Sequence, residues 1–379
     1  MAEERKLRLH PWRRLVRLAR RIGGAVRRRL DIAREILRPP VVLFQGIPSD
    51  GDQVVTVMRS GLLDDLGESF FVGRIFKEIR RQQTLGRQWA WKIPGLARRH
   101  SCEFVLARVA KRWKSVARWV LVQGSARTYF LPLFVEASVE IEDEQRLLSN
   151  RSLKEDVRKV RKRGFDFDLS RSKEALAVFD ESYRRPYYAK AHGLDSVIID
   201  YDHIMKSSEG PEVGEAWRLL RVHAGGEWVA GMIIRHDESG ASLWELGVKN
   251  GDPTHVKMGA LWAAYWFSIQ YLRERGYTKA SFMYVRPFLR CGVLQYKLKY
   301  QPQLSAPLPF GILLFVTKNN ELTRGILLNE PFIQEKGTTL NATYFVRASN
   351  DELDERSRRL WALGGFQEPE AVLLDETSV

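Results

Sequence analysis

The side chains best suited to acid–base chemistry in this sequence are one carboxylate and two imidazoles. Glu245 lies in a strand-like run whose alternation places its side chain opposite those of Trp244 and Leu246. A carboxylate on such a strand can accept a proton from an attacking amine, directly or through water. His192 and His255 are alternative bases, because imidazole titrates near neutral pH. The competing interpretations are a solvent-facing carboxylate and histidines that are structural or exposed.

A cluster of phenol and guanidinium groups could hold an acceptor molecule. The cluster comprises Tyr183, Arg184, Arg185, Tyr187 and Tyr188. Phenols can line a pocket, and a guanidinium group binds phosphate or carboxylate through two parallel hydrogen bonds. The four-residue spacing of Phe179 and Tyr183 is equally typical of a helix face packed in a core.

Other chemistries have little support in the sequence. With two cysteines, Cys102 and Cys291, a disulfide framework or a multi-cysteine zinc site is not expected, and a reducing compartment is favoured. Cys291 could be a nucleophile, but no histidine partner is identifiable, so a buried thiol is the favoured interpretation. The sequence lacks metal-ligand spacing, a P-loop, a dinucleotide fingerprint and a Gly-x-Ser-x-Gly elbow. We therefore expect no metal.

Positive charge is concentrated in the front half of the chain, which has a net charge of +15. Residues 1–40 hold 13 Lys/Arg and 4 Asp/Glu, residues 74–118 hold 13 and 2, and residues 151–163 hold 7 and 2. The remainder is net acidic. Such basic fields attract phosphate-rich partners, namely nucleic acid, anionic lipid or a phosphorylated small molecule.

Residues 1–40 are predicted to form a basic amphipathic helix. Apolar residues recur at spacings of three and four from Trp12 to Leu37, and Pro39 and Pro40 end the helix. This helix could dock on an anionic membrane surface or on RNA, or pack on the protein's own body. Its arginines argue against a signal peptide, and the longest apolar stretch is too short to span a bilayer. A cytoplasmic protein is expected, soluble or peripheral at the inner face of the membrane.

Residues 41–149 are predicted to form a domain of mixed helices and strands. Trp89, Trp91, Trp113 and Trp119 alternate there with Lys and Arg residues. Basic residues among aromatic ones can stack bases and neutralise phosphates. Because the spacing around Trp113 is helical, packing of these aromatic side chains in the core is the favoured interpretation.

Residues 150–320 are predicted to form a further domain, and residues 321–379 a C-terminal extension. Ser152 and Glu155 have the spacing of a capping box at the start of a helix. Three strands separated by hairpin turns are expected later in this domain, followed by a helix, a strand, a short helix and a strand. The predicted ranges are Trp217–His223, Glu227–Arg235, Ala241–Val248, Val256–Arg275, Lys279–Tyr284, Gly292–Lys297 and Gly311–Val316.

This order of elements resembles the core of a GNAT acyltransferase. The segments that carry the resemblance are Arg151–Gly164, Phe179–Tyr188 with His192 and Gly193, Leu219–Gly231, Gly247–Gly251, Met258–Gly276, Arg286–Phe288, Gly292 and Tyr296–Lys297. Together they look like the Fem-type branch of the superfamily, which includes peptidoglycan-bridge aminoacyltransferases. Such proteins often contain two GNAT-like halves. The resemblance implies an α/β (α+β) fold with a mixed, mostly antiparallel sheet flanked by helices, and a degenerate first half at residues 41–149.

The resemblance also implies an activity, which is transfer of an acyl or aminoacyl group to an amine or hydroxyl acceptor. The donor is acyl-CoA or an aminoacyl-tRNA, and in GNAT folds its phosphates rest at the start of the helix after the fourth strand. The residues at that position are His255, Lys257, Met258, Gly259 and Ala260. One glycine of the usual signature is missing, and both donors stay open. Arg286 and Lys297, with Tyr183, Arg184 and Tyr187, are expected to contact the acceptor. The alternative is a non-catalytic GNAT-like module that binds RNA or an anionic membrane through its basic front half.

Overall fold

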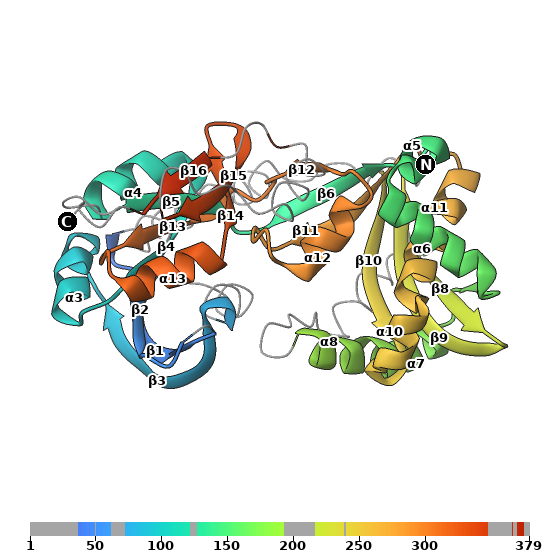
Figure 1. Cartoon of the computed structure of the whole chain (residues 1–379), viewed down its shortest axis with the longest axis horizontal. Coiled ribbons are helices and arrows are strands. Elements are labelled where there is room, and N and C mark those ends of the chain that lie inside the picture. The colour runs from blue at the N-terminus through green and yellow to red at the C-terminus, as the bar shows by residue number, and fades with distance from the viewer. Residues whose placement is uncertain are drawn as a thin grey trace, which may run out of the picture.

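The computed structural model describes residues 37–49, 51–61, 73–121, 127–192, 217–238, 240–347, 366 and 370–374 (Figure 1). The helix predicted over residues 1–40 falls almost entirely outside these ranges. Three sheets, mostly antiparallel and flanked by helices, make up the described structure. The expected mixed α/β fold class is therefore confirmed. None of the described helices is both long enough and apolar enough to cross a bilayer.

The first sheet has six strands in the order β3-β1-β2-β4-β13-β5. Its strands are β1 (Pro40–Pro48), β2 (Val55–Ser60), β3 (Phe76–Arg87), β4 (Phe104–Ala110), β5 (Arg127–Pro132) and β13 (Phe310–Val316). β13 is apolar at nearly every position because it is paired along both edges and covered on both faces. The helices α3 (Ile93–Arg99) and α4 (Lys114–Leu121) cover one face through Ala97 and Ala117.

The other face of the first sheet is covered by the C-terminal part of the chain. The elements there are α13 (Glu321–Asn329), β14 (Phe332–Lys336), β15 (Thr339–Val346) and β16 (Glu370–Leu373), whose strands form a third sheet. Phe332 and Phe345 pack edge-on against Tyr129 of β5, with ring centroids 5.4 and 5.5 Å away. The C-terminal extension therefore completes the core on this face of the first sheet. We refer to the first sheet and the elements that cover it as the first unit, and to the second sheet and its helices as the second unit.

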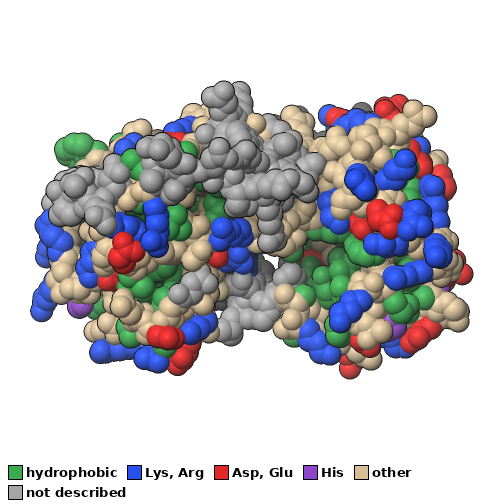
Figure 2. All heavy atoms as spheres, viewed as in Figure 1, with side chains coloured by type: hydrophobic (Ala, Val, Ile, Leu, Met, Phe, Trp, Pro, Cys, Tyr) green, Lys and Arg blue, Asp and Glu red, His purple; other side chains and the backbone are tan. Residues whose placement is uncertain are grey.

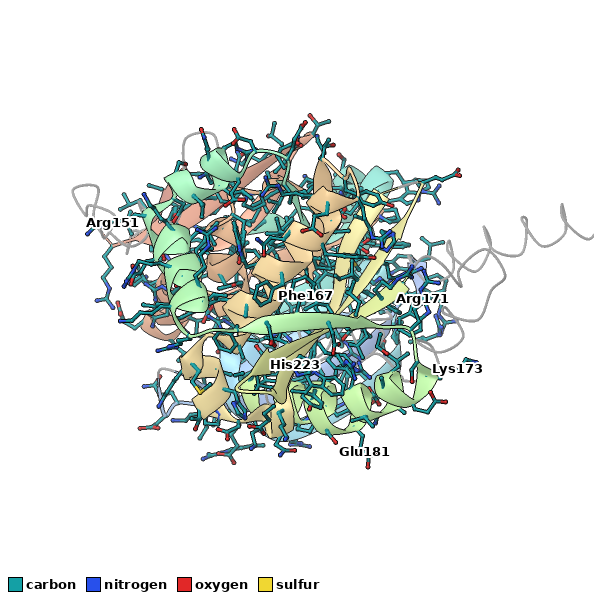
Figure 3. All side chains as sticks on the ribbon, turned by 90° about the vertical axis from the view of Figure 1, so that its right-hand side faces the viewer. Arg151, Phe167, Arg171, Lys173, Glu181 and His223 are labelled. Carbon is teal, nitrogen blue, oxygen red and sulfur yellow. The ribbon has the colours of Figure 1, made fainter. Side chains whose placement is uncertain are left out.

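The second sheet has seven strands in the order β12-β6-β11-β10-β9-β8-β7. The strands are β6 (Val135–Glu140), β7 (Asp166–Ser170), β8 (Trp217–Ala224), β9 (Glu227–Asp237), β10 (Gly240–Val248), β11 (Lys279–Val285) and β12 (Gln303–Ser305). The helices are α5 (Glu144–Ser149), α6 (Arg151–Lys162), α7 (Lys173–Phe179), α8 (Arg185–His192), α10 (Pro253–Met258), α11 (Ala260–Glu274) and α12 (Gly292–Leu298). α6 and α11 lie on one face and α7 on the other, as seen beside β7 in Figure 3.

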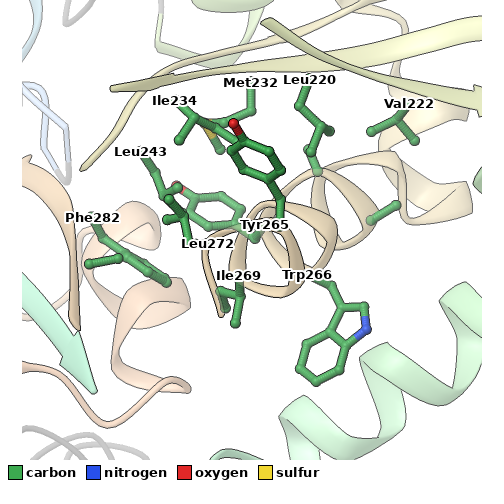
Figure 4. Close-up of a cluster of buried hydrophobic side chains, with 14 of the residues drawn as sticks. Leu220, Val222, Met232, Ile234, Leu243, Tyr265, Trp266, Ile269, Leu272 and Phe282 are labelled. Atoms are coloured by element: carbon green, nitrogen blue, oxygen red, sulfur yellow. The ribbon is translucent and has the colours of Figure 1, made fainter. Parts of the chain in front are cut away.

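The core of the second unit lies between this sheet and α11. Tyr265 and Leu272 of α11 are buried in one cluster with strand residues such as Phe282, whereas Trp266 points towards α6 (Figure 4). A helix enclosed by a sheet and by α6 can be apolar on most of its circumference, which explains its nearly unbroken apolar sequence.

Each large sheet contains one strand from the other part of the chain. In the first sheet β2 and β4 are parallel, and β13 pairs antiparallel with both β4 and β5. In the second sheet β10 and β11 are parallel, and β6 pairs antiparallel with both β11 and β12. The same local pattern of one parallel and two antiparallel pairings therefore occurs in both sheets. The boundaries expected at residues 149 and 320 do not follow the sheets, because β6 and β13 cross between them.

The start of α6 differs from the capping box expected at Ser152. The side chain of Asn150 accepts hydrogen bonds from the amides of Ser152 and Leu153, at 3.0 and 3.2 Å. Asparagine at this position satisfies amides that have no partner within the helix. Glu155 is consequently free to pair with Arg158 on the helix surface, at 2.8 Å.

Candidate active site

The second sheet opens between β10 and β11. The two parallel strands pair at Ser242 and Ser281, after which β11 turns away from β10 (Figure 1). Two irregularities accompany the separation. Trp244 forms a bulge against β9, and Met283 has a φ of +59°, which is strained for a residue other than glycine. The molecule is hollowed in the angle between these strands (Figure 2), so the opening faces solvent.

Glu245 lies at the wall of this opening, in a cluster of buried charges. Its carboxylate is 3.5 Å from a guanidinium nitrogen of Arg184, and it accepts a hydrogen bond from the hydroxyl of Tyr188. Arg184, which is 0% exposed, also donates to Asp180 through Nε at 2.6 Å. The other Asp180 oxygen accepts from Nε of Arg185, again at 2.6 Å. The competing interpretation of Glu245 as a solvent-facing strand carboxylate is thus excluded.

Burial sets the electrostatics of this cluster. Removal from water raises the pKa of Glu245, while the charge of Arg184 and the hydroxyl of Tyr188 oppose the rise. Removal from water also raises the pKa of Tyr188 well above its ordinary value, and the nearby Glu245 adds to the effect. A carboxylate with a raised pKa, bonded to a phenol, can take up and pass on a proton.

The bulge explains why Glu245 lies where alternation alone did not place it. In regular alternation Trp244 and Glu245 would point to opposite faces. Glu245 pairs with Ile233 directly after Leu243 pairs with Ile234, so Trp244 is an extra residue. Trp244 packs with the cluster around Phe179, on the same face as Arg184. The prediction that these two side chains lie on opposite faces is therefore wrong.

Tyrosines from both layers of helices meet near the opening. The charge of Tyr265 on α11 contributes to raising the pKa of the Tyr188 phenol of α8, and the charge of Tyr187 contributes to raising the pKa of Tyr265. Tyr265 in turn packs on Tyr296, with ring centroids 5.1 Å apart. The hydroxyls of Tyr296 and Tyr300 are 2.9 Å apart and share a hydrogen bond. The phenols of α8, α11 and α12 thus provide several hydroxyl groups close to one another.

Lys297 lies at the β11 side of the opening. It is buried, and its ammonium donates to the carbonyls of Met283 and Tyr284 at 3.3 and 3.1 Å. Removal from water lowers the pKa of Lys297 to about 8, with Cys291 and Glu136 opposing the shift. The structure therefore holds one buried anion near β10 and one buried cation against the end of β11.

The segment expected to bind donor phosphates is interrupted by a bend. Instead of one helix from Val256, the chain forms α10 and α11, separated by Gly259 in the left-handed conformation with a φ of +96°. The amide of Thr254 donates to the Asp252 carboxylate at 2.7 Å, so an acid already caps the first helix. Gly259 and Ala260 are buried, and Trp262 covers Gly259. The prediction of a continuous helix is wrong because glycine permits the bend.

The remaining candidate residues are not all at the opening. Tyr183 is a core residue. Its hydroxyl donates to the carbonyl of Trp228 at 2.9 Å, and its ring stacks on the Trp228 ring. Arg184 is fully buried and engaged with carboxylates. His255 lies in α10 and its Nδ1 is buried, with no hydrogen-bond partner among the described residues. His192 is the last residue of α8, and its side chain lies outside the description.

Three further candidates are found on the surface or partly buried. Lys257 is exposed, and Met258 and Arg286 are partly buried. The carbonyls of Lys257 and Met258 accept hydrogen bonds from the guanidinium of Arg163, which directly follows α6. The geometry therefore brings together Glu245, Arg184, Tyr187 and Tyr188, while the donor residues form a separate group. Asp180 and Tyr265 were missed by sequence reasoning. The spacing of Asp180 and Arg184, four residues apart on a helix, is the signal that could have indicated the ion pair.

No metal site coincides with this opening in the part of the chain that the structure describes. No group of three or more His, Cys, Asp or Glu side chains is placed there to hold a metal ion. A cavity of about 650 Å³ lies elsewhere, between β12 and the third sheet, with Lys111, Ser305 and Glu335 in its wall. The Lys111 ammonium and the Glu335 carboxylate pair at 2.6 Å beside it.

Comparison with protein-family models and with curated protein sequences finds no match. Solved structures similar to this chain include L-PGS from Bacillus licheniformis, at 15% identity and a TM-score of 0.34, covering 75% of this chain and 87% of that one. FemX matches at 12% identity and a TM-score of 0.40, covering 71% and 83%. A GCN5-related N-acetyltransferase from Kribbella flavida matches at 8% and 0.28, covering 83% and 71%. These likenesses concern the fold alone, and the described strands of this chain form mixed, mostly antiparallel sheets flanked by helices.

Proposed function

We propose that this protein transfers an acyl or aminoacyl group to an amine or hydroxyl acceptor at the opening between β10 and β11. The observation that carries the proposal is the separation of these strands beyond Ser242 and Ser281, with Glu245 buried at the edge. A gap between parallel strands gives an extended donor access to unpaired backbone groups. The neighbouring carboxylate and phenols supply acid–base groups at the same place.

The chemistry follows from the charges around the gap. The acceptor nitrogen or oxygen attacks the donor's carbonyl carbon, a new C–N or C–O bond forms, and the bond to the leaving oxygen or sulfur breaks. Glu245 takes the proton of the nucleophile, directly or through Tyr188, and the leaving group finally receives a proton. Lys297 supplies positive charge for the oxyanion that develops on the carbonyl. Tyr187 and Arg286 are the candidates for holding the acceptor.

An aminoacyl-tRNA is the donor that we infer. A pyrophosphate at the start of α10 would meet the Asp252 carboxylate, and the start of α11 is closed by the burial of Gly259 and Ala260. Both features disfavour coenzyme A, because its phosphates need free amides at a helix N-terminus. The exposed cations of α6, including Arg151, Lys154 and Lys162, offer charge for a longer phosphate backbone.

A non-catalytic module is the second candidate. The same burial of Gly259 and Ala260 favours it, since a protein without a donor site needs no accessible amides. In that case the buried charges around Arg184 serve the fold alone. Activity measurements decide between the two candidates.

The test uses total tRNA charged with radiolabelled amino acids, and labelled acetyl-CoA in a parallel reaction. Each is incubated with the full chain and a mixture of amine, peptide and lipid acceptors, and label is followed from donor to product. We expect label to leave the tRNA pool, and Glu245→Gln to slow the transfer. Glu140→Gln, which changes a partly buried strand carboxylate paired with Lys279, is the control. Consumption of acetyl-CoA alone would contradict aminoacyl-tRNA as the donor. No transfer from either donor would favour the non-catalytic module.

A further inference from the structure

Four large apolar side chains are exposed on the first unit, far from the opening. They are Trp91, Trp113, Val116 and Trp119, and Trp119 is 81% exposed. We refer to these four residues as the tryptophan face. The interpretation of these tryptophans as core residues is therefore wrong. Single exposed apolar residues are ordinary, but neighbouring exposed tryptophans mark an interaction surface.

The four residues belong to one region of the surface. Trp113 ends a 3-10 turn directly before α4, and Val116 and Trp119 lie three residues apart on α4. The turn that contains Trp91 packs against α4. Ala117 of α4 and Ala97 of α3 face the sheet, which leaves the opposite sides of both helices outward. α3 and α4 lie at the end of the molecule remote from α8 and α10 (Figure 1).

Cations outnumber acids around the tryptophan face, where Glu335 pairs with Lys111 at 2.6 Å. Residues 89–121 contain eight Lys/Arg and one Asp/Glu. That acid, Glu103, is buried and paired with Lys318 at 2.7 Å. The exposed cations of the region are Lys92, Arg98, Arg99, Arg112 and Arg118, and none makes an ion pair with another described residue. Within the part of the chain that the structure describes, these five cations are not neutralised, and they favour an anionic partner.

Charge decides among the occupants that could cover this face. Residues 1–40 hold 13 Lys/Arg against 4 Asp/Glu, so this segment would be repelled, and a second copy would meet its own cations. Among partners outside this chain, an anionic macromolecule is left. Val116 decides between RNA and lipid, because an aliphatic side chain has no ring to stack on a base, whereas it is readily buried at a membrane interface together with tryptophan.

We propose that the tryptophan face docks on the surface of an anionic lipid bilayer. α4 lies along the interface, with Trp119 and Val116 entering the boundary between headgroups and acyl chains, and Arg112 and Arg118 lie among the headgroup phosphates. This surface is distinct from the predicted helix of residues 1–40, and it is independent of the proposed transferase activity. It orients the whole chain on the membrane.

The test measures co-sedimentation of the full chain with vesicles of phosphatidylcholine containing about one third phosphatidylglycerol. Trp119→Ser should lower the partition coefficient about tenfold, which is the loss of one buried aromatic side chain. Arg112→Gln and Arg118→Gln should each lower it about fivefold, and added salt should diminish those two effects. Every variant keeps residues 1–40, so the contribution of that segment is the same throughout.

Val116→Glu is compared with Val178→Glu, a matched control in α7 of the second unit. The two valines are 46% and 47% exposed, so both variants should keep the wild-type unfolding midpoint, while binding is lost in Val116→Glu alone. Retention on immobilised tRNA is measured in parallel. Variants that bind vesicles like the wild type would overturn the proposal. Loss of tRNA binding with vesicle binding retained would overturn it as well, in favour of an RNA surface.

Discussion

Arg184 is the residue whose replacement tests most directly how the candidate site is held together. Arg184→Met keeps the length of the side chain and removes its charge, so Glu245 retains the Tyr188 hydroxyl as its described partner. Two unit charges 3.5 Å apart interact by about 5 kcal/mol at an effective dielectric constant of 20. Breaking buried ion pairs costs about 3–5 kcal/mol in general. The Asp180 carboxylate loses less electrostatic stabilisation than the Glu245 carboxylate, because Arg185 still pairs with Asp180. We expect a loss of about 3–5 kcal/mol in the free energy of unfolding.

The pH dependence identifies the carboxylate responsible. Burial already raises the pKa of Glu245 above 4.5, and loss of Arg184 raises it further. When folding raises the pKa of an acid, the folded state is destabilised as pH rises from the unfolded-state pKa to the folded-state pKa. Below the unfolded-state pKa this destabilisation is absent. The difference between wild type and Arg184→Met should therefore be largest near pH 8 and shrink towards pH 5. Urea titrations followed by circular dichroism at both pH values measure it.

The double variant Arg184→Met with Glu245→Gln provides the control. Since it removes both charges, it should recover most of the stability lost in the single variant, and its pH dependence should be weaker. An equal loss at pH 5 and pH 8, with no recovery in the double variant, would refute the reasoning. Packing of the Arg184 side chain, and not its charge, would then hold the cluster together.

Three further outcomes are expected. Glu245→Gln should lower turnover by roughly 10²–10⁴-fold and leave donor affinity nearly unchanged, as measured by initial rates and donor titration. The difference in the free energy of unfolding between the wild type and Lys297→Met should shift by about 3 kcal/mol in favour of the wild type between pH 8 and 10.5, because burial lowers the folded-state pKa of Lys297 to about 8 and the unfolded chain binds more protons in that range; urea titrations of both proteins at the two pH values test this, and the comparison cancels the titration of other groups. Gly259→Ala should destabilise the fold by about 1–3 kcal/mol, since a Cβ would lie 2.5 Å from the Trp262 ring on a backbone of positive φ, and thermal unfolding measures the loss.

Local patterns in the sequence were sufficient to find the elements of the second unit. The three expected meander strands agree with β8, β9 and β10 to within two residues at each end, because alternation and Gly-containing turns are local signals. The partners of β6 and β13 could not be found in this way. Their pairing joins residues about 140 to 210 positions apart, for instance Val139 with Ala280 and Val316 with Phe104, and alternation does not specify a partner.

The candidate site was only partly accessible to sequence reasoning. Glu245 was identified by its place in a strand, but its bonding to Arg184 depends on the bulge at Trp244, which period-two alternation cannot indicate. The helix break was accessible in principle. Asp252 followed by Pro253 is a typical helix start, and Gly259 six residues later is a typical helix end. The length of the apolar run after Gly259 outweighed these signals and favoured one long helix.

The two halves of the chain differ at the point where a reaction could occur. In the first sheet β2 and β4 stay paired through four successive positions, from Val57 with Phe104 to Ser60 with Ala107. Continuous pairing uses the backbone groups of both strands and leaves no gap for a donor. In the second sheet the pairing of β10 with β11 stops at Ser242, where the bulge and the strained Met283 follow. Strain of this kind persists where surrounding structure maintains it, and β6, a strand from the first half of the chain, pairs with β11 at Tyr284 and Val285. The first half therefore contributes to the second half's opening through a strand, without needing a reactive site of its own.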